Sequence, residues 1–150
     1  SPRPGAKRLI NALREKGYEE IIIVSGGISS LVGRLARELC LDRFLANDFK
    51  TKSKNGKELI TGANCKFNFS QKGEIMKELT RELKLSLDQS IAIGDSSFDK
   101  GMLKTADTGI AFNPKDEEVK EAADIVEESE DMSDSSDFFS ASSSFDFLKK

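Results

Sequence analysis

The chain has 150 residues, of which 37% are hydrophobic, and a formal net charge of −3, which suits a single domain with one core. Because its 23 basic and 26 acidic residues nearly balance and form no basic block, a nucleic-acid partner is not expected. Histidine is absent, which excludes Ser-His-Asp and Cys-His nucleophile activation and imidazole zinc sites, so any catalysis would use carboxylates, lysine, hydroxyls and backbone amides.

A helix, a buried strand and a second helix are predicted first along the chain. Apolar residues recur at helical spacing from Gly5 to Lys16 and again from about Ile28 to Leu39. Between them, Ile21–Val24 is β-branched throughout, as in a strand buried on both faces of a parallel sheet. This longest apolar run is far shorter than the ~18 residues that a membrane-spanning helix needs. No membrane partner is expected, and the chain is predicted to be cytoplasmic.

A β-hairpin is predicted next. Asn55-Gly56 separates the β-tolerant segments Asp48–Lys52 and Glu58–Thr61, and this dipeptide favours a primed two-residue turn. The two cysteines, Cys40 and Cys65, have neither the spacing of a metal knuckle nor the density of a disulfide scaffold. We therefore predict that they are buried, reduced thiols.

Short apolar strands alternate with helices in the following part of the chain. The predicted elements are a helix at Gln71–Leu83, a strand at Ile91–Ile93, a helix containing Met102 and Leu103, a strand at Gly109–Phe112, a helix at Glu117–Ala123 and a strand at Asp124–Val126. Such alternation implies βαβ crossovers and a mostly parallel sheet that helices cover on both faces. The predicted fold class is α/β.

The composition changes sharply after Val126. Residues Glu127–Lys150 include eight serines, seven acidic residues and four phenylalanines, a bias that is typical of disorder. We therefore predict a folded core at residues 1–126 and a disordered, acidic Ser/Phe-rich tail at residues 127–150. The alternative is a short linear motif, in which the phenylalanines dock on a partner and nearby serines accept phosphate.

The residues that follow each strand are candidates for chemistry, because ligands of open α/β sheets bind at the carboxyl ends of the strands. After the first strand, Ser25-Gly26-Gly27 offers a hydroxyl and unobstructed amides beside a helix N-terminus, which suits a phosphoryl group. The plainer alternative for this segment is a tight turn.

Two carboxylates and one lysine complete the candidate residues. Asp95 and Asp99 lie four residues apart, close enough to share one hard cation, for which Mg²⁺ is the natural candidate. Alternatively, Asp95 or Ser96 caps the following helix and Asp99 decorates its first turn without any metal. Lys72 is expected in the first turn of a helix, where the helix dipole disfavours a cation. Its position indicates an anionic neighbour or, more plainly, a solvated face.

Several motifs in this order resemble those of the haloacid dehalogenase superfamily, and most closely its phosphoserine phosphatase-like branch. They are V-S-G-G at Val24–Gly27, Q-K-G-E-I at Gln71–Ile75, I-G-D-S-S-F-D-K-G-M-L at Ile93–Leu103, A-D-T-G-I-A-F-N-P-K at Ala106–Lys115 and A-A-D-I-V at Ala122–Val126. The resemblance covers about Pro4 to Val126. It implies a Rossmann-like, three-layer α/β/α fold with a mostly parallel sheet and a small β-hairpin insertion.

The resemblance also implies roles for individual residues. In that family an aspartate attacks phosphorus, and water then hydrolyses the aspartyl phosphate. Ser25 and the amide of Gly26 would hold the phosphoryl oxygens, and Lys72 would pair with the phosphoryl group and the nucleophile. Asp95 would ligate Mg²⁺. Asp99 would support the metal through water or hold Lys72 in place.

The sequence departs from the family pattern in two respects. The D-x-D-x-T strand with the nucleophile, and the cap domain that selects the substrate, are expected before Gly5 and are not among these residues. Phe145–Phe147 contains one aspartate without the remainder of that motif. Ser96 and Ser97 would shape the metal loop, but Phe98 stands where relatives commonly have asparagine. Without the central strand, we expect the chain to be poorly stable or oligomeric.

Two functions are compatible with these residues. The first is a magnesium-dependent phosphomonoester hydrolase that acts on a small phosphorylated metabolite, with phosphoserine the best single guess. Its nucleophile would lie outside this chain, and its partners would be a second copy of the chain or a complementing N-terminal segment. The alternative is a catalytically inactive domain that binds phosphate or a partner, which the missing nucleophile, Phe98 and the acidic tail favour.

Overall fold

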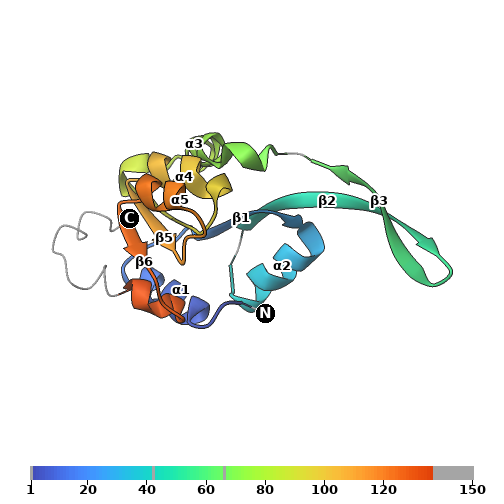
Figure 1. Cartoon of the computed structure of the whole chain (residues 1–150), viewed down its shortest axis with the longest axis horizontal. Coiled ribbons are helices and arrows are strands. Elements are labelled where there is room, and N and C mark those ends of the chain that lie inside the picture. The colour runs from blue at the N-terminus through green and yellow to red at the C-terminus, as the bar shows by residue number, and fades with distance from the viewer. Residues whose placement is uncertain (1, 42, 66, 137–150) are drawn as a thin grey trace. The chain divides into compact units, whose positions relative to one another are not determined.

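The computed structural model describes residues 2–41, 43–65 and 67–136 (Figure 1). The chain forms two compact units, of which the first consists of Ser1–Glu19 and Ser70–Lys150 and the second of Glu20–Phe69. Within the described residues, the strands form two three-stranded sheets, one in each unit.

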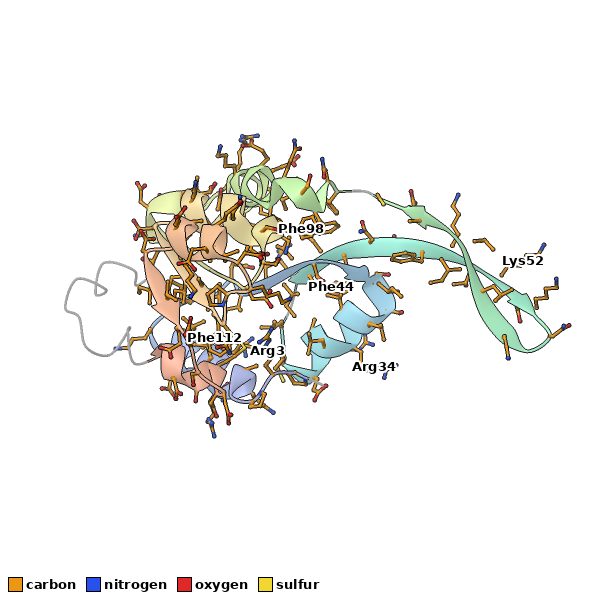
Figure 2. The ribbon with its side chains drawn as sticks, in the orientation of Figure 1. Arg3, Arg34, Phe44, Lys52, Phe98 and Phe112 are labelled. Carbon is orange, nitrogen blue, oxygen red and sulfur yellow. The ribbon has the colours of Figure 1, made fainter. Side chains whose placement is uncertain are left out.

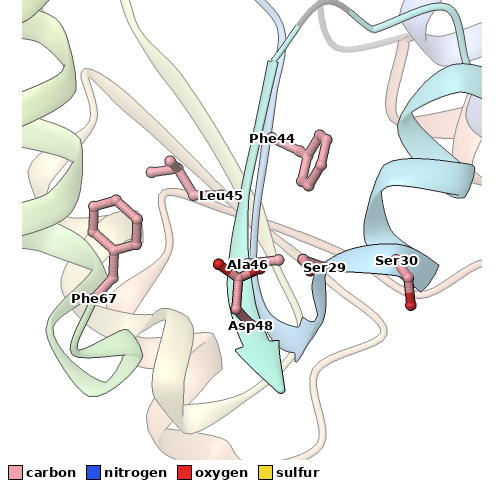
Figure 3. Close-up of a pocket in the computed structure, with 7 residues that line it drawn as sticks. All are labelled: Ser29, Ser30, Phe44, Leu45, Ala46, Asp48 and Phe67. Atoms are coloured by element: carbon pink, nitrogen blue, oxygen red, sulfur yellow. The ribbon is translucent and has the colours of Figure 1, made fainter. Parts of the chain in front are cut away.

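The second unit contains a parallel strand pair joined by a helix. β1 (Ile22–Ile28) is followed by α2 (Ser29–Glu38), and β2 (Arg43–Lys54) then pairs in parallel with β1. The Phe44 ring of β2 points toward α2 (Figure 3) and lies 2.8 Å from the place that a β-carbon on Gly33 would occupy. Glycine at this position therefore lets the helix pack closely on the strand.

β2 continues as one arm of a long antiparallel hairpin with β3 (Lys57–Asn64), visible in Figure 1. The turn residues Asn55 and Gly56 both have positive φ, 53° and 71°, as a type I′ turn requires. The hairpin and its turn were both predicted correctly. The strands are several residues longer than predicted.

The first unit is an α/β layer with three parallel strands in the order β4-β5-β6. Its helices and strands are α1 (Ala6–Glu15), α3 (Lys72–Glu82), β4 (Ile91–Gly94), α4 (Lys100–Thr105), β5 (Thr108–Phe112), α5 (Glu117–Ala122) and β6 (Ile125–Glu127). Short 3-10 turns lie at Phe69–Gln71, Leu87–Gln89, Ser97–Asp99 and Met132–Ser136. Every residue of the central strand β5 is buried.

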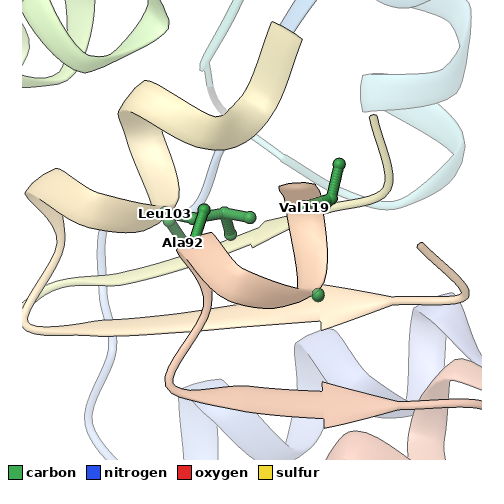
Figure 4. Packing of buried hydrophobic residues seen from close by; sticks show 5 residues of the cluster. Ala92, Leu103 and Val119 are labelled. Atoms are coloured by element: carbon green, nitrogen blue, oxygen red, sulfur yellow. The ribbon is translucent and has the colours of Figure 1, made fainter. Parts of the chain in front are cut away.

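The core of this unit lies between its strands and the helices α4 and α5. Leu103 of α4 and Val119 of α5 are almost fully buried, and both belong to one hydrophobic cluster with Ala92 of β4 (Figure 4). Full burial of a leucine or valine side chain contributes roughly 1.5–3 kcal/mol. This packing fixes β4 and α4, and thereby the loop between them.

The predicted elements have the correct type and order, and outside the hairpin and β1 their ends differ by about one residue. β1 is the exception, because it continues through Ser25, Gly26 and Gly27 to Ile28. Its pairing with β2 changes register between Val24 and Ile28. The two glycines tolerate this irregularity because they carry no side chain that must fit the pleat.

The prediction for the cysteines is wrong with respect to burial. Cys40 and Cys65 form no disulfide, but both are exposed. Cys40 lies two residues beyond the end of α2 and has a φ of 56°, and the amide of Leu41 donates to the carbonyl of Ala36 over 2.8 Å. This hydrogen bond closes the helix end with Cys40 in the left-handed capping position, so the thiol lies at an exposed helix end and not in the core.

Part of the predicted tail falls within the described residues. The Asn113 side chain donates to the Ser129 carbonyl over 2.5 Å and accepts from the Ser129 amide over 3.1 Å. The phenylalanines of the tail lie outside the described residues, so the division between residues 1–126 and 127–150 stays a prediction. Among the residues that the structure describes, no helix has the length and apolar character needed to cross a bilayer.

Candidate functional site

A tight loop follows β4 and leads into α4. Its centre is the buried side chain of Asp99. One carboxylate oxygen, Oδ2, accepts from the amides of Asp95 and Ser96 over 3.0 and 3.1 Å and from the Ser96 hydroxyl over 3.1 Å. A β-carbon on Gly94 would come within 2.4 Å of the Asp99 side chain. Glycine at position 94 therefore allows the carboxylate to close the loop.

The other oxygen of Asp99, Oδ1, accepts a hydrogen bond from the Lys72 ammonium over 2.6 Å. Both side chains are largely buried, with 11% of Lys72 and 6% of Asp99 exposed. Lys72 begins α3, where the helix dipole disfavours a cation. Asp99 is thus the anionic neighbour that the position of Lys72 indicates.

The ionisation of Asp99 follows from these contacts. Burial alone would raise its pKa, but the hydrogen bond and charge of Lys72, together with the amides of Asp95 and Ser96, hold the pKa below its usual value. The Asp99 carboxylate is therefore ionised at neutral pH. Since neither charge is solvated, removing one partner would leave the other buried and uncompensated, which typically costs about 3–5 kcal/mol.

Asp95 has a different environment from Asp99. Its side chain is 27% exposed, and its Oδ2 accepts from Arg3 over 2.8 Å and pairs with Lys115 over 3.2 Å. The Lys115 amide also donates to the Asp95 carbonyl over 2.9 Å. Asp95 is thus the accessible carboxylate of the loop, and two basic side chains from other segments meet it.

Sequence reasoning missed Arg3 and Lys115. Lys115 follows β5, the neighbour of β4, so the rule that ligands bind at the carboxyl ends of strands could have found it. Arg3 precedes α1 and lies three residues before the helix. No motif marks it, because its approach to Asp95 depends on how the chain is folded.

Ser25 and Gly26 belong to the other unit, in which their contacts are local. The Ser25 hydroxyl accepts from the Gly27 amide over 3.1 Å. The Gly26 carbonyl accepts from the Asn47 side chain over 3.1 Å. These contacts describe an irregular strand end, and the predicted role of both residues in holding a phosphoryl group stays a prediction.

A cavity of about 510 Å³ lies in the same unit, beside the first turn of α2 (Figure 3). Its lining is partly aromatic and includes Phe44 and Phe67, with the hydroxyls of Ser29 and Ser30 and the carboxylate of Asp48. Neither Ser25 nor Gly26 lines this cavity.

The carboxylates differ in how well they would suit a divalent cation. Within the described residues, no three acidic, cysteine or histidine side chains gather in a group that could hold a metal. Both oxygens of Asp99 already accept hydrogen bonds, so direct ligation would require Lys72 to leave or the loop to open. Asp95 fits better, because both of its ion pairs use Oδ2 and Mg²⁺ often binds through one or two carboxylates plus waters. The role of Asp99 as a metal ligand stays a prediction.

Comparison with known proteins relates this chain to one family. Residues 67–135 match the family model described as haloacid dehalogenase-like hydrolase. The chain is 37% identical over 120 residues to the phosphoserine phosphatase of Archaeoglobus fulgidus, and the matched segment covers 80% of this chain and 34% of that protein. It is 33% identical over 132 residues to the phosphoserine phosphatase of Methanocaldococcus jannaschii, and this match covers 88% of this chain and 61% of that protein.

Solved structures agree with the sequence matches. A structure of a phospho-aspartyl intermediate analogue of phosphoserine phosphatase has a TM-score of 0.80 and 31% identity, and the match covers 92% of this chain and 64% of that one. These similarities confirm the predicted α/β class and the haloacid dehalogenase-like fold. The chain spans only about a third to three fifths of the length of the two curated relatives. By sequence and by fold, the chain is similar to haloacid dehalogenase-like hydrolases and, over the length that it spans, to phosphoserine phosphatases.

Proposed function

We propose that this chain is part of a magnesium-dependent phosphomonoester hydrolase of the haloacid dehalogenase type, with phosphoserine or a similar small metabolite as its substrate. The observation that carries the proposal is the buried Lys72–Asp99 pair beside the accessible carboxylate of Asp95. The names of the related proteins support a phosphatase.

Lys72 would supply positive charge to the transferring phosphoryl group. Phosphoryl transfer is accelerated mainly by positioning and by electrostatic stabilisation of the equatorial oxygens. Asp99 holds the ammonium in one place, so little reorganisation would be needed during the reaction. Asp99 is in this view a positioning residue, whereas Lys72 touches the substrate.

Asp95 would hold the cation. A bound Mg²⁺ would neutralise phosphoryl charge and help to orient the ester. Ser25 and the amide of Gly26 would bind phosphoryl oxygens, as the family resemblance implies. Ser96 and Ser97 would shape the loop around the ion.

In our proposal, the nucleophilic aspartate is not one of these 150 residues. One related structure is described as a phospho-aspartyl intermediate analogue, and we propose the same covalent intermediate here, formed on an aspartate that a complementing segment supplies. A second copy of the chain is a further candidate partner. The cytoplasmic location predicted from the sequence stays a prediction.

The test is hydrolysis of phosphoserine, with p-nitrophenyl phosphate as a generic ester, by the protein as its gene encodes it. We expect phosphate release that needs Mg²⁺ and that falls at least about a hundredfold in Lys72→Met. The matched control is Lys77→Met, because Lys77 lies on the same helix and pairs with the exposed Glu74. Equal activity in the two variants, or activity that is insensitive to chelation, would contradict the proposal.

One observation favours an inactive binding domain as a second candidate. Phe98, which stands where relatives commonly have asparagine, is 61% exposed and is labelled in Figure 2. An aromatic side chain at the loop could contact a protein partner. In that case Phe98→Asn would remove a partner from affinity capture without creating phosphatase activity, whereas a gain in Mg²⁺-dependent hydrolysis would favour the enzyme.

A further inference from the structure

Two basic side chains from segments outside the loop meet the carboxylate of Asp95. Arg3 and Lys115 both contact Oδ2, over 2.8 and 3.2 Å. In the same loop, Asp99 is already neutralised by Lys72. The group of Arg3, Lys72, Lys115, Asp95 and Asp99 therefore carries a net charge of about +1 at neutral pH. A divalent cation that approaches Asp95 meets an excess of positive charge rather than an open carboxylate.

The position of Arg3 is defined by the packing around it. The centre of its guanidinium lies 5.9 Å from the centroid of the Phe112 ring, a cation–π distance. Figure 2 shows the two side chains next to each other at the carboxyl end of β5. Phe112 is itself buried, so it offers a fixed platform for the guanidinium.

The segment before α1 is also fixed from the other side, by residues 129–133, which we call the clip. The Met132 amide donates to the Pro4 carbonyl over 2.9 Å. Arg8 forms an ion pair with Asp131, and its Nε donates to the Ser133 hydroxyl over 3.3 Å. The clip is held in turn by Asn113 through Ser129. Arg3 is thus built into the unit.

We propose that Arg3 and Lys115 are internal counter-cations of Asp95, which a divalent cation must displace from the carboxylate in order to bind. This inference rests on the proposed metal site at Asp95. The two basic side chains lower the affinity of the site for Mg²⁺, because binding breaks both ion pairs and brings like charges together. They also keep Asp95 compensated while no metal is bound.

The first experiment measures the dissociation constant of Mg²⁺ by isothermal titration calorimetry. Partly exposed ion pairs contribute about 0.2–1 kcal/mol each, so removing both should tighten binding by roughly two- to thirtyfold. The variant is Arg3→Gln/Lys115→Gln. The matched control is Lys100→Gln/Lys104→Gln, which removes the same charge from α4, where Lys100 pairs with Glu118. We expect the control to bind Mg²⁺ within about 1.5-fold of the wild type.

A second measurement observes Arg3 directly. We expect the NMR signal of its Nε–H, assigned with the Arg3→Gln variant, to shift when Mg²⁺ is added to the wild-type protein. In Asp95→Asn the same signal should not respond to Mg²⁺. If the Arg3 signal shifts with Mg²⁺ in the wild type but not in Asp95→Asn, the guanidinium changes its partner when the ion binds to Asp95.

The outcomes separate this inference from the metal site itself. If Asp95→Asn abolishes Mg²⁺ binding while Arg3→Gln/Lys115→Gln keeps the wild-type dissociation constant, the site stands and the counter-cation role is overturned. Equal tightening in the α4 control would reduce the effect to net charge and would also overturn it. If Mg²⁺ binds Asp95→Asn with the same dissociation constant as the wild type, or binds to neither protein, the metal site and the inference both fail.

Discussion

The backbones of Gly73 in α3 and Gly101 in α4 lie so close together that a β-carbon on Gly73 would come within 2.7 Å of the Gly101 carbonyl oxygen. Lys72 directly precedes Gly73, and Asp99 lies two residues before Gly101. The close helix approach and the buried ion pair are therefore parts of one arrangement. Space for a side chain at position 73 could be made only by moving the helices apart.

Gly73→Ala should destabilise the first unit by about 1–3 kcal/mol, as overpacking usually does. It should also lengthen the Lys72–Asp99 contact. Urea unfolding measures the first effect, and the NMR signal of the Lys72 ammonium reports the second. Gly62→Ala is the control, because nothing lies within 4 Å of a β-carbon there. If both variants lose the same stability, the helix contact does not depend on glycine.

Lys72→Met should cost about 3–5 kcal/mol of unfolding free energy, because it leaves the Asp99 carboxylate buried without a partner. The double variant Lys72→Met/Asp99→Asn should recover part of that loss. The same double-mutant cycle on Lys77 and Glu74, an exposed pair of α3, should give a coupling below about 0.5 kcal/mol. Equal coupling energies in the two cycles would show that burial does not strengthen the Lys72–Asp99 pair.

The stability of the protein should depend on pH through Asp99. Although burial would raise its pKa, Lys72 and the amides of Asp95 and Ser96 hold the folded-state pKa below the usual value of 3.8. The unfolded chain therefore takes up the proton first as the pH falls. The stabilising contribution is complete above the unfolded pKa and is lost as the pH falls through the folded pKa.

The unfolding free energy of the wild type and of Asp99→Asn, measured between about pH 6 and about pH 2, tests this dependence. We expect the difference between the two proteins to shrink on acidification below about pH 4. Asp88→Asn, which changes an exposed aspartate of the same unit, provides the control. A difference that stays constant down to the lowest pH would exclude a lowered pKa at Asp99.

The clip can be tested with two glycines that share a backbone conformation. Gly5 and Gly56 have φ of 77° and 71°, so an alanine at either position incurs a left-handed strain of about 1–2 kcal/mol. At Gly5 the added β-carbon would also collide with Asp131 and the Ser133 amide, whereas at Gly56 nothing lies within 4 Å. Gly5→Ala should therefore lose clearly more unfolding free energy than Gly56→Ala, measured in urea. Equal losses would mean that the clip does not constrain the segment before α1.

The regular elements could be predicted because their signals are local. The β-branched run at Ile21–Val24, the Asn55-Gly56 turn and the helical spacing after Gln71 each depend on neighbours in the sequence. The ordered motifs likewise identified Lys72 and Asp99, which the fold brings together. Exposure of Cys40 was not predictable in the same way, since it depends on how α2 ends.

The environment of Asp95 was beyond sequence reasoning for a related physical reason. Arg3 lies 92 residues from Asp95 in the chain, and no periodicity connects residues so far apart. The contact exists because Phe112 and the clip define where the segment before α1 runs. Such long-range ion pairs follow from tertiary packing, so they become visible only once the packing is known.

Asp99 uses its two oxygens for different tasks, one to close the Gly94–Asp99 loop and the other to hold Lys72. Neither asparagine nor glutamate can replace both: asparagine keeps a single acceptor oxygen and loses the charge, and glutamate adds a methylene group for which Gly94 leaves little room. The shape of the loop and the orientation of Lys72 therefore both depend on this one carboxylate. Any change that removes the negative charge of this carboxylate, including its protonation, therefore affects the loop and Lys72 at the same time.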